Sequence, residues 1–95
     1  MIISFACKET RKIFEGNKSS AFPQEIVRRA YSKMLSLDAA EELSDLRNPP
    51  SNNLEKLIGD RSGQYSIRIN RTYRICFRWI GNAAVDVEIV DYHKN

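Results

Sequence analysis

The chain has 95 residues, of which 42% are hydrophobic and 28% are charged, and its formal net charge is +3. This length suits a single domain over residues 1–95 with a core of modest size. No run of 18 apolar residues is present, which argues against a membrane span. The start is also unlike a signal peptide, because its apolar stretch is short and the charges follow it. We therefore expect a cytoplasmic protein.

The two cysteines and the one histidine limit the chemistry that this chain offers. In a reducing cytosol we expect Cys7 and Cys76 to be free thiols, with Cys76 buried in a strand. The spacing of these residues matches no zinc-binding pattern. The four glycines are isolated and form no phosphate-binding loop. We therefore predict that the protein uses no metal and no cofactor.

In the first half of the chain, residues 2–6 predict a short strand and residues 8–15 a short helix that ends at Gly16. A loop leads to Pro23, which suits the first turn of a helix beginning at Gln24. Apolar residues then recur with helical spacing and predict a stripe that packs in the core. The stripe consists of Ile26, Ala30, Met34 and Leu37, flanked by Val27, Tyr31 and Leu35.

The end of this helix carries a pattern of its own. Asp38-Ala-Ala-Glu41 is typical of a capping box with an aspartate in the Ser/Thr position. It predicts a change of helix direction and a second, short helix that reaches about Asp45. The stretch RNPPSNN that follows has the composition of a loop.

The second half alternates with the period of a strand, in the three segments 64–69, 73–79 and 84–92. Placing apolar residues opposite each other pairs Ile69 with Tyr73 and leaves residues 70–72 as a loop. The apolar set predicted to face the helices is Tyr65, Ile67, Ile69, Tyr73, Ile75, Phe77, Trp79, Val85, Val87 and Ile89. The predicted fold is α+β, with the N-terminal helices on one face of a small, mainly antiparallel sheet and the other face open and basic.

Charge is distributed unevenly along the chain. Between Arg61 and Trp79 there are five arginines and no acidic residue. The predicted register sets Arg68 opposite Arg74, and like charges in that position destabilise a sheet. We interpret the pair as a site for an anionic polymer such as nucleic acid. The alternative is an ordinary solvated strand face on which nearby acids, Asp86 and Glu88, neutralise the arginines.

The last strand runs into Asp91, Tyr92 and His93, and His93 is the only histidine. Arginine binds phosphate through paired hydrogen bonds, histidine transfers protons near neutral pH, and tyrosine stacks on bases. With the basic face, these groups suit the cleavage of RNA through attack of its own 2′-hydroxyl, which needs no metal. A terminal histidine is more often a surface residue, so the pattern alone is not specific.

The run LIGDRSGQYSIRINRTYRICF, followed by VEIVDYH, resembles the HigB toxins of the RelE/ParE superfamily of bacterial toxin–antitoxin systems. The segments MIISFACKETRKIFEG and LDAAEELSDLRNPP fit the same family, so the resemblance covers nearly the whole chain. It implies two helices packed on an antiparallel-rich sheet. It also implies an endoribonuclease that cleaves messenger RNA in the ribosomal A site. The implied partners are a HigA-like helix-turn-helix antitoxin, messenger RNA, ribosomal RNA, and operator DNA contacted through the antitoxin.

The resemblance also assigns catalytic residues. The terminal Asp-Tyr-His of the family falls on Asp91, Tyr92 and His93, and its arginine in the penultimate strand falls on Arg74. By this assignment His93 protonates the leaving 5′-oxygen and Arg74 stabilises the phosphate. Tyr92 orients the nucleotide by stacking or a hydrogen bond, and Asp91 holds the terminal segment or the histidine tautomer.

One segment departs from the family. Where some HigB relatives carry a histidine and a nearby lysine, this chain has Glu55 and Ile58. YoeB-type relatives have a glutamate at the first of these places. The resemblance therefore implies that Glu55 is the general base, with Lys56 as a further candidate cation.

Other basic residues complete the predicted interface. The residues predicted to contact RNA are Lys56, Arg61, Arg68, Arg71, Arg78, Arg28, Arg29 and Lys33. The last three also fit a solvated helix face.

Two alternatives to the nuclease are a non-catalytic inhibitor of DNA gyrase, as in ParE-type relatives, and a weakened toxin that acts mainly as antitoxin partner and corepressor. The combination of a base, a cation and an acid favours the nuclease, because a pure binder has no use for it.

Overall fold

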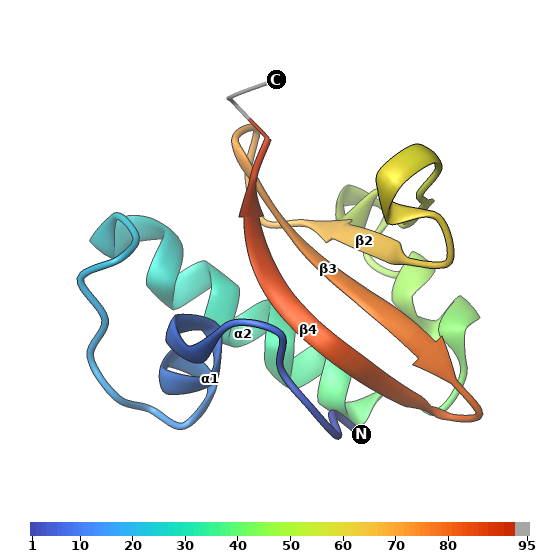
Figure 1. Ribbon diagram of the computed structural model, residues 1–95, viewed down its shortest axis with the longest axis horizontal. Coiled ribbons are helices and arrows are strands. Elements are labelled where there is room, and N and C mark those ends of the chain that lie inside the picture. The colour runs from blue at the N-terminus through green and yellow to red at the C-terminus, as the bar shows by residue number, and fades with distance from the viewer. Residues whose placement is uncertain (93–95) are drawn as a thin grey trace.

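The computed structural model describes residues 1–92 and has helices on one side of a four-stranded antiparallel sheet (Figure 1). This confirms the predicted fold class. The elements are α1 (Lys8–Phe14), α2 (Gln24–Ala39), β1 (Glu55–Lys56), β2 (Tyr65–Arg68), β3 (Tyr73–Ile80) and β4 (Ala83–Asp91), with three 3-10 turns, η1 (Leu43–Arg47), η2 (Pro50–Asn52) and η3 (Gly59–Arg61). The strands lie in the order β1-β2-β3-β4. None of the helices within residues 1–92 is long and apolar enough to cross a membrane.

Helix α2 buries the predicted stripe against the sheet. Its four stripe residues are at most 1% exposed and join the core with Ile67, Ile75, Phe77 and other strand residues. The prediction that Tyr31 and Leu35 widen this stripe is wrong, since they are 40% and 46% exposed. Each lies one residue beyond a stripe position and is therefore rotated by about 100° around the helix, away from the sheet.

The prediction of a capping box at residues 38–41 is also wrong. Helix α2 continues to Ala39, and the carboxylate of Asp38 accepts a hydrogen bond from the backbone N–H of Ile2 at 2.7 Å. A capping box forms four residues later, where Glu42 and Asp45 exchange hydrogen bonds at the start of η1. The aspartate that resembled a cap is thus used to hold the N-terminal segment.

The N-terminal segment follows the outer edge of β4, but it does not form the strand predicted over residues 2–6. Only two isolated parallel bridges are present, Ile2 with Ala84 and Phe5 with Val87. Four backbone hydrogen bonds of 2.8–3.1 Å join the segment to Ala84 and Val87. Residues 1–6 thereby satisfy edge groups that would otherwise be open to pairing with another chain.

The first hairpin has the predicted register. Arg68 pairs with Arg74, and the backbone N–H of Ile69 donates to the carbonyl of Tyr73 at 3.0 Å. The side chain of Asn70 closes the loop by accepting hydrogen bonds from the N–H groups of residues 72 and 73. Matching apolar faces was therefore sufficient to align β2 with β3.

The second hairpin departs from strict alternation because it contains a β-bulge. The pairing shifts between Cys76 and Arg78, and Asp86 has a positive φ of 54°. The shift pairs Val85 with Arg78, so Val85 lies on the face away from the helices and the prediction for it is wrong. Ala84 takes the core position instead and is 0% exposed.

Candidate active site

The face of the sheet away from the helices carries a polar cluster around Arg74. Paired residues of antiparallel strands share a face, and the row Glu55, Ser66, Cys76 and Glu88 crosses all four strands. Strand β1 brings Glu55 into this row. Because β1 has only two residues, the sequence shows no alternation that would predict it. Glu55 is therefore placed beside Arg74 by a strand that was not predicted.

The centre of this face is covered, in contrast to the open surface that was predicted. Arg74 is 8% exposed, and Ser66 and Cys76 are 0% exposed. Asn53 accepts a hydrogen bond from Arg74 and the ring of Tyr92 lies over it, so the guanidinium contacts protein at one edge and on one face. The basic character of the face thus comes from a buried arginine as well as from exposed ones.

The guanidinium of Arg74 is held along one edge. Its Nε donates to the hydroxyl of Ser66 at 2.8 Å, and its Nη2 donates to the backbone carbonyls of Asn53 and, at 3.4 Å, of Ser66. Nη2 also lies 3.9 Å from the Glu55 carboxylate. No acceptor within residues 1–92 binds Nη1. Within the described part of the chain, the bonded nitrogens of this guanidinium are therefore Nε and Nη2.

Tyr92 lies over the same arginine. Its backbone N–H donates to the carbonyl of Thr72 at 2.7 Å, which extends the β3–β4 pairing by one residue. The Cζ atom of Arg74 is 5.9 Å from the centroid of its ring, a cation–π geometry. Its hydroxyl is 3.7 Å from the sulfur of Cys76. Burial, and then the contact with Cys76, raise the pKa of Tyr92, so it remains a neutral hydroxyl at physiological pH.

The structure thus brings three of the five predicted catalytic residues together: Glu55, Arg74 and Tyr92. Asp91 pairs with Tyr73, and strand alternation places it on the face opposite to Tyr92. His93, the predicted acid, lies outside the described residues. Tyr92 is its immediate neighbour in the chain and belongs to the cluster.

Two of the predicted RNA-binding arginines have acidic partners. Arg61 lies 3.1 Å from Glu88, and Arg78 lies 3.7 Å from Asp86. Burial opposes the charge of Arg61, but its hydrogen bond to Glu88 and the negative charges near it together outweigh this and raise the pKa of Arg61. Asp86 and Glu88 are the acids expected to neutralise the arginines if the strand face is an ordinary solvated one. They partly neutralise the positive charge of Arg61 and Arg78 on this face.

The other predicted RNA-binding cations of the sheet differ from Arg61 and Arg78 in their neighbours. Arg68 is beside Arg74, Arg71 is exposed in the β2–β3 loop, and no acidic residue within residues 1–92 forms an ion pair with either. Lys56 follows Glu55 on β1 and pairs with Tyr65 on the helix side of the sheet, where both line a small pocket. The structure therefore does not bring Lys56 together with Glu55 and Arg74.

On α2, Arg28 and Arg29 are exposed, but the expectation that Lys33 faces solvent is wrong. Its ammonium donates to the side-chain carbonyl of Asn52, which is 0% exposed. Burial, and then the charge of Arg29, lower the pKa of Lys33. Asn52 in turn donates to two backbone carbonyls, at 3.0 and 3.2 Å. This network holds the turn whose Asn53 carbonyl binds Arg74.

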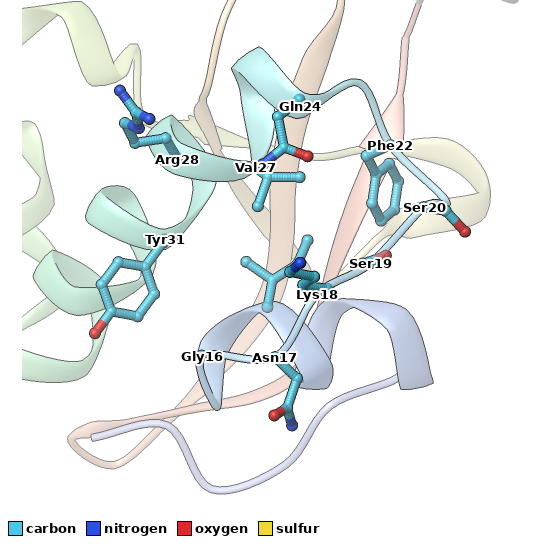
Figure 2. Close-up of a pocket in the computed structure, with 11 residues that line it drawn as sticks. Gly16, Asn17, Lys18, Ser19, Ser20, Phe22, Gln24, Val27, Arg28 and Tyr31 are labelled. Carbon is cyan, nitrogen blue, oxygen red and sulfur yellow. The ribbon is translucent and has the colours of Figure 1, made fainter.

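A separate cavity of about 720 Å³ lies between α2 and the loop after α1. Figure 2 shows Val27, Arg28 and Tyr31 on α2 and Lys18 and Phe22 on the loop around it. Among residues 1–92, Arg28 is the only predicted site residue that lines it, and no member of the Arg74 cluster does. The cavity is therefore distinct from the candidate active site.

Comparison with solved structures shows where else this fold occurs. A chain of the YoeB–YefM complex from Staphylococcus aureus aligns with a TM-score of 0.60 and 20% identity over 98% of both chains. A chain of the heterotetrameric YoeB–YefM toxin–antitoxin complex from the same organism gives 0.60 and 21%, again over 98% of both chains. The fold is thus one found in toxin–antitoxin complexes.

Sequence comparison identifies the family. The model for HigB-like toxins, described as the RelE-like toxin of the type II toxin–antitoxin system HigB, matches residues 3–93. The chain is 37% identical to Toxin HigB-1 of Vibrio cholerae serotype O1 over 95 residues, 99% of both chains. It is 34% identical to Endoribonuclease HigB of Proteus vulgaris over 93 residues, which is 98% of this chain and all of the relative. The chain therefore belongs to the HigB-like toxin family, and the resemblance read from the sequence is confirmed.

Proposed function

We propose that this protein is an endoribonuclease toxin that cleaves messenger RNA in the ribosomal A site and thereby stops translation. The observation that carries the proposal is the meeting of Glu55, Arg74 and Tyr92 on one face of the sheet. Membership of the HigB-like family supports it, as does a relative 34% identical over nearly the whole chain that is named an endoribonuclease.

The proposed reaction needs no metal and no protein nucleophile. Glu55 takes the proton of the 2′-hydroxyl, whose oxygen then attacks the adjacent phosphorus. Arg74 stabilises the negative charge that grows on the phosphate oxygens. His93 gives a proton to the 5′-oxygen as its bond to phosphorus breaks. The products are a 2′,3′-cyclic phosphate and a free 5′-hydroxyl.

The different exposure of the base and the cation suits this chemistry. The Glu55 side chain is 57% exposed, whereas that of Arg74 is only 10% exposed. An exposed carboxylate is able to reach the ribose, while a buried guanidinium keeps its orientation when the substrate arrives. A fixed cation aimed at developing charge needs no reorganisation during the reaction. The ring of Tyr92 lies over Arg74, which supports its proposed contact with the nucleotide base.

The proposal includes partners and a place of action. Family membership supports neutralisation by a cognate antitoxin, for which we propose a HigA-like helix-turn-helix protein that also links the toxin to operator DNA. The exposed cations Arg28, Arg29 and Arg71 are proposed contacts to ribosomal RNA or the message. The site of action is the cytoplasm, where the ribosomes are.

Primer extension on a translated message, with and without ribosomes, tests the nuclease. We expect the wild-type protein to cut within the reading frame only when ribosomes are present. Glu55→Gln, Arg74→Ala and His93→Ala should each lower the cleavage rate by about 10²–10⁴-fold and relieve growth inhibition, because each removes a catalytic group. Glu25→Gln, an exposed carboxylate on α2, is the matched control for Glu55→Gln. Circular dichroism checks that the variants fold. If Arg74→Ala does not fold, Arg74→Lys replaces it in the cleavage assay.

Other outcomes favour the alternatives. DNA damage with an intact message points to a gyrase inhibitor. Weak toxicity with tight antitoxin binding points to a corepressor. Full cleavage by His93→Ala shows that the acid is assigned to the wrong residue.

A further inference from the structure

Ser66 is a buried polar residue at the centre of the face that carries Arg74. It is 0% exposed and lies on β2, between Glu55 of β1 and Cys76 of β3. A buried hydroxyl without a hydrogen bond is costly, so its partners indicate what it is for. Its oxygen accepts a hydrogen bond from Nε of Arg74 at 2.8 Å. Its own hydrogen then remains available to donate.

Arg74 has further anchors next to Ser66. Its Nη2 donates to the backbone carbonyl of Asn53 and, at 3.4 Å, to that of Ser66. Tyr92, whose ring lies over Arg74, is anchored separately, with its hydroxyl 3.7 Å from the sulfur of Cys76.

The contacts decide which part of the guanidinium meets a ligand. An arginine binds phosphate through two neighbouring nitrogens, and its planar group offers several such pairs. Here Ser66 and Asn53 bind Nε and Nη2, and Nη1 has no acceptor within residues 1–92. Without the Ser66 hydroxyl, rotation about the last side-chain bonds would present different nitrogens.

We propose that Ser66 is a positioning residue, whose hydroxyl fixes the Arg74 guanidinium with Nη1 directed to the scissile phosphate. This inference rests on the proposed function. Ser66 touches no substrate and acts through Arg74. Its effect is therefore on the rate of the chemical step, since misplacing a catalytic group by about 1 Å costs up to about 10²-fold.

Ribosome-dependent cleavage by Ser66→Ala and Ser66→Thr tests the inference. Ser66→Ala is expected to lower kcat by about 10²-fold with little change in KM. Ser66→Thr keeps the hydroxyl and is expected to restore most of the rate. Ile67→Val is the matched control, because it alters a 0% exposed residue of the same strand on the helix side. It is expected to leave kcat near that of the wild type.

A double-mutant cycle separates positioning from mere support of the fold. In the Arg74→Lys background the Nε donor is absent, so Ser66→Ala is expected to cause no further loss. If Ser66→Ala slows Arg74→Lys by the same factor as it slows the wild type, the inference is overturned.

A readout without RNA keeps the inference testable by itself. In nitrogen-15 NMR spectra the Nε–H of Arg74 should exchange slowly with solvent in the wild type and in Ser66→Thr, and quickly in Ser66→Ala. Unchanged exchange in Ser66→Ala would overturn the positioning role. If the wild-type protein cuts no message, the proposed function fails, and the NMR result still decides whether Ser66 orients Arg74.

Discussion

Burial moves the pKa values of two residues beside Arg74 in the same direction. Burial raises the pKa of the Cys76 thiol, and the hydrogen bond between Cys76 and Tyr92 offsets this only in part. Burial likewise raises the pKa of Tyr92. Both groups are therefore neutral at physiological pH. Two anions at these positions would neutralise the guanidinium and weaken its attraction for phosphate.

The two cysteines should differ in reactivity for this reason. The thiolate is the reactive form, so a raised pKa and full burial both slow the modification of Cys76. We expect iodoacetamide at pH 8 to alkylate the half-buried Cys7 first. The rate at Cys76 should rise only as the pH is raised well above the usual thiol pKa. Peptide mass spectrometry measures both rates, and the urea-unfolded protein is the control in which they should converge. Equal rates in the folded protein at pH 8 would contradict the burial of Cys76.

Among the elements, α1 is joined to the edge of β4 by a buried polar contact. The hydroxyl of Thr10 accepts a hydrogen bond from the backbone N–H of Ile89 at 3.0 Å, and Thr10 is 0% exposed. Thr10→Val keeps the volume and leaves that N–H without an acceptor. We expect a loss of about 1–3 kcal/mol in the free energy of unfolding, measured by urea denaturation.

Thr10→Ser is the control for this prediction, because it keeps the acceptor and removes only a methyl group. It should retain more of the stability than Thr10→Val does. The reverse order would mean that the methyl group, and not the hydrogen bond, fixes α1 on the sheet.

At the scale of the whole molecule, the cations within residues 1–92 divide into those with acidic partners among these residues and those without. Arg61 belongs to the first group and Arg71 to the second. Binding of single-stranded RNA becomes weaker with salt, by a slope of about 0.7 for each phosphate contact. Arg71→Ala is therefore expected to reduce that slope by about 0.7 in a salt titration of RNA affinity. Arg61→Ala is the matched control and should reduce it less, because Glu88 already pairs with Arg61. Equal reductions would show that the ion pair does not screen Arg61 from RNA.

Several features of the protein were readable from the sequence because they depend on local periodicity. The helical spacing of Ile26, Ala30, Met34 and Leu37 predicted the buried face of α2. The alternation around the 70–72 loop predicted the β2–β3 register, including Arg68 opposite Arg74. Both follow from burying apolar side chains next to one another, which neighbouring residues alone determine. The grouping of Arg74 with the terminal segment came from the family resemblance.

Other features depend on partners far away in the chain. Asp38 resembled a helix cap but binds Ile2, and Lys33 resembled a surface cation but binds Asn52. The two-residue strand β1 exists because β2 pairs with it, and the bulge near Asp86 moves Val85 to the other face. Local pattern therefore determined α1, α2, the three strands β2–β4 and most of the core of this protein. The tertiary structure decided which polar side chains meet, because a hydrogen bond between distant segments leaves no periodic trace in either of them.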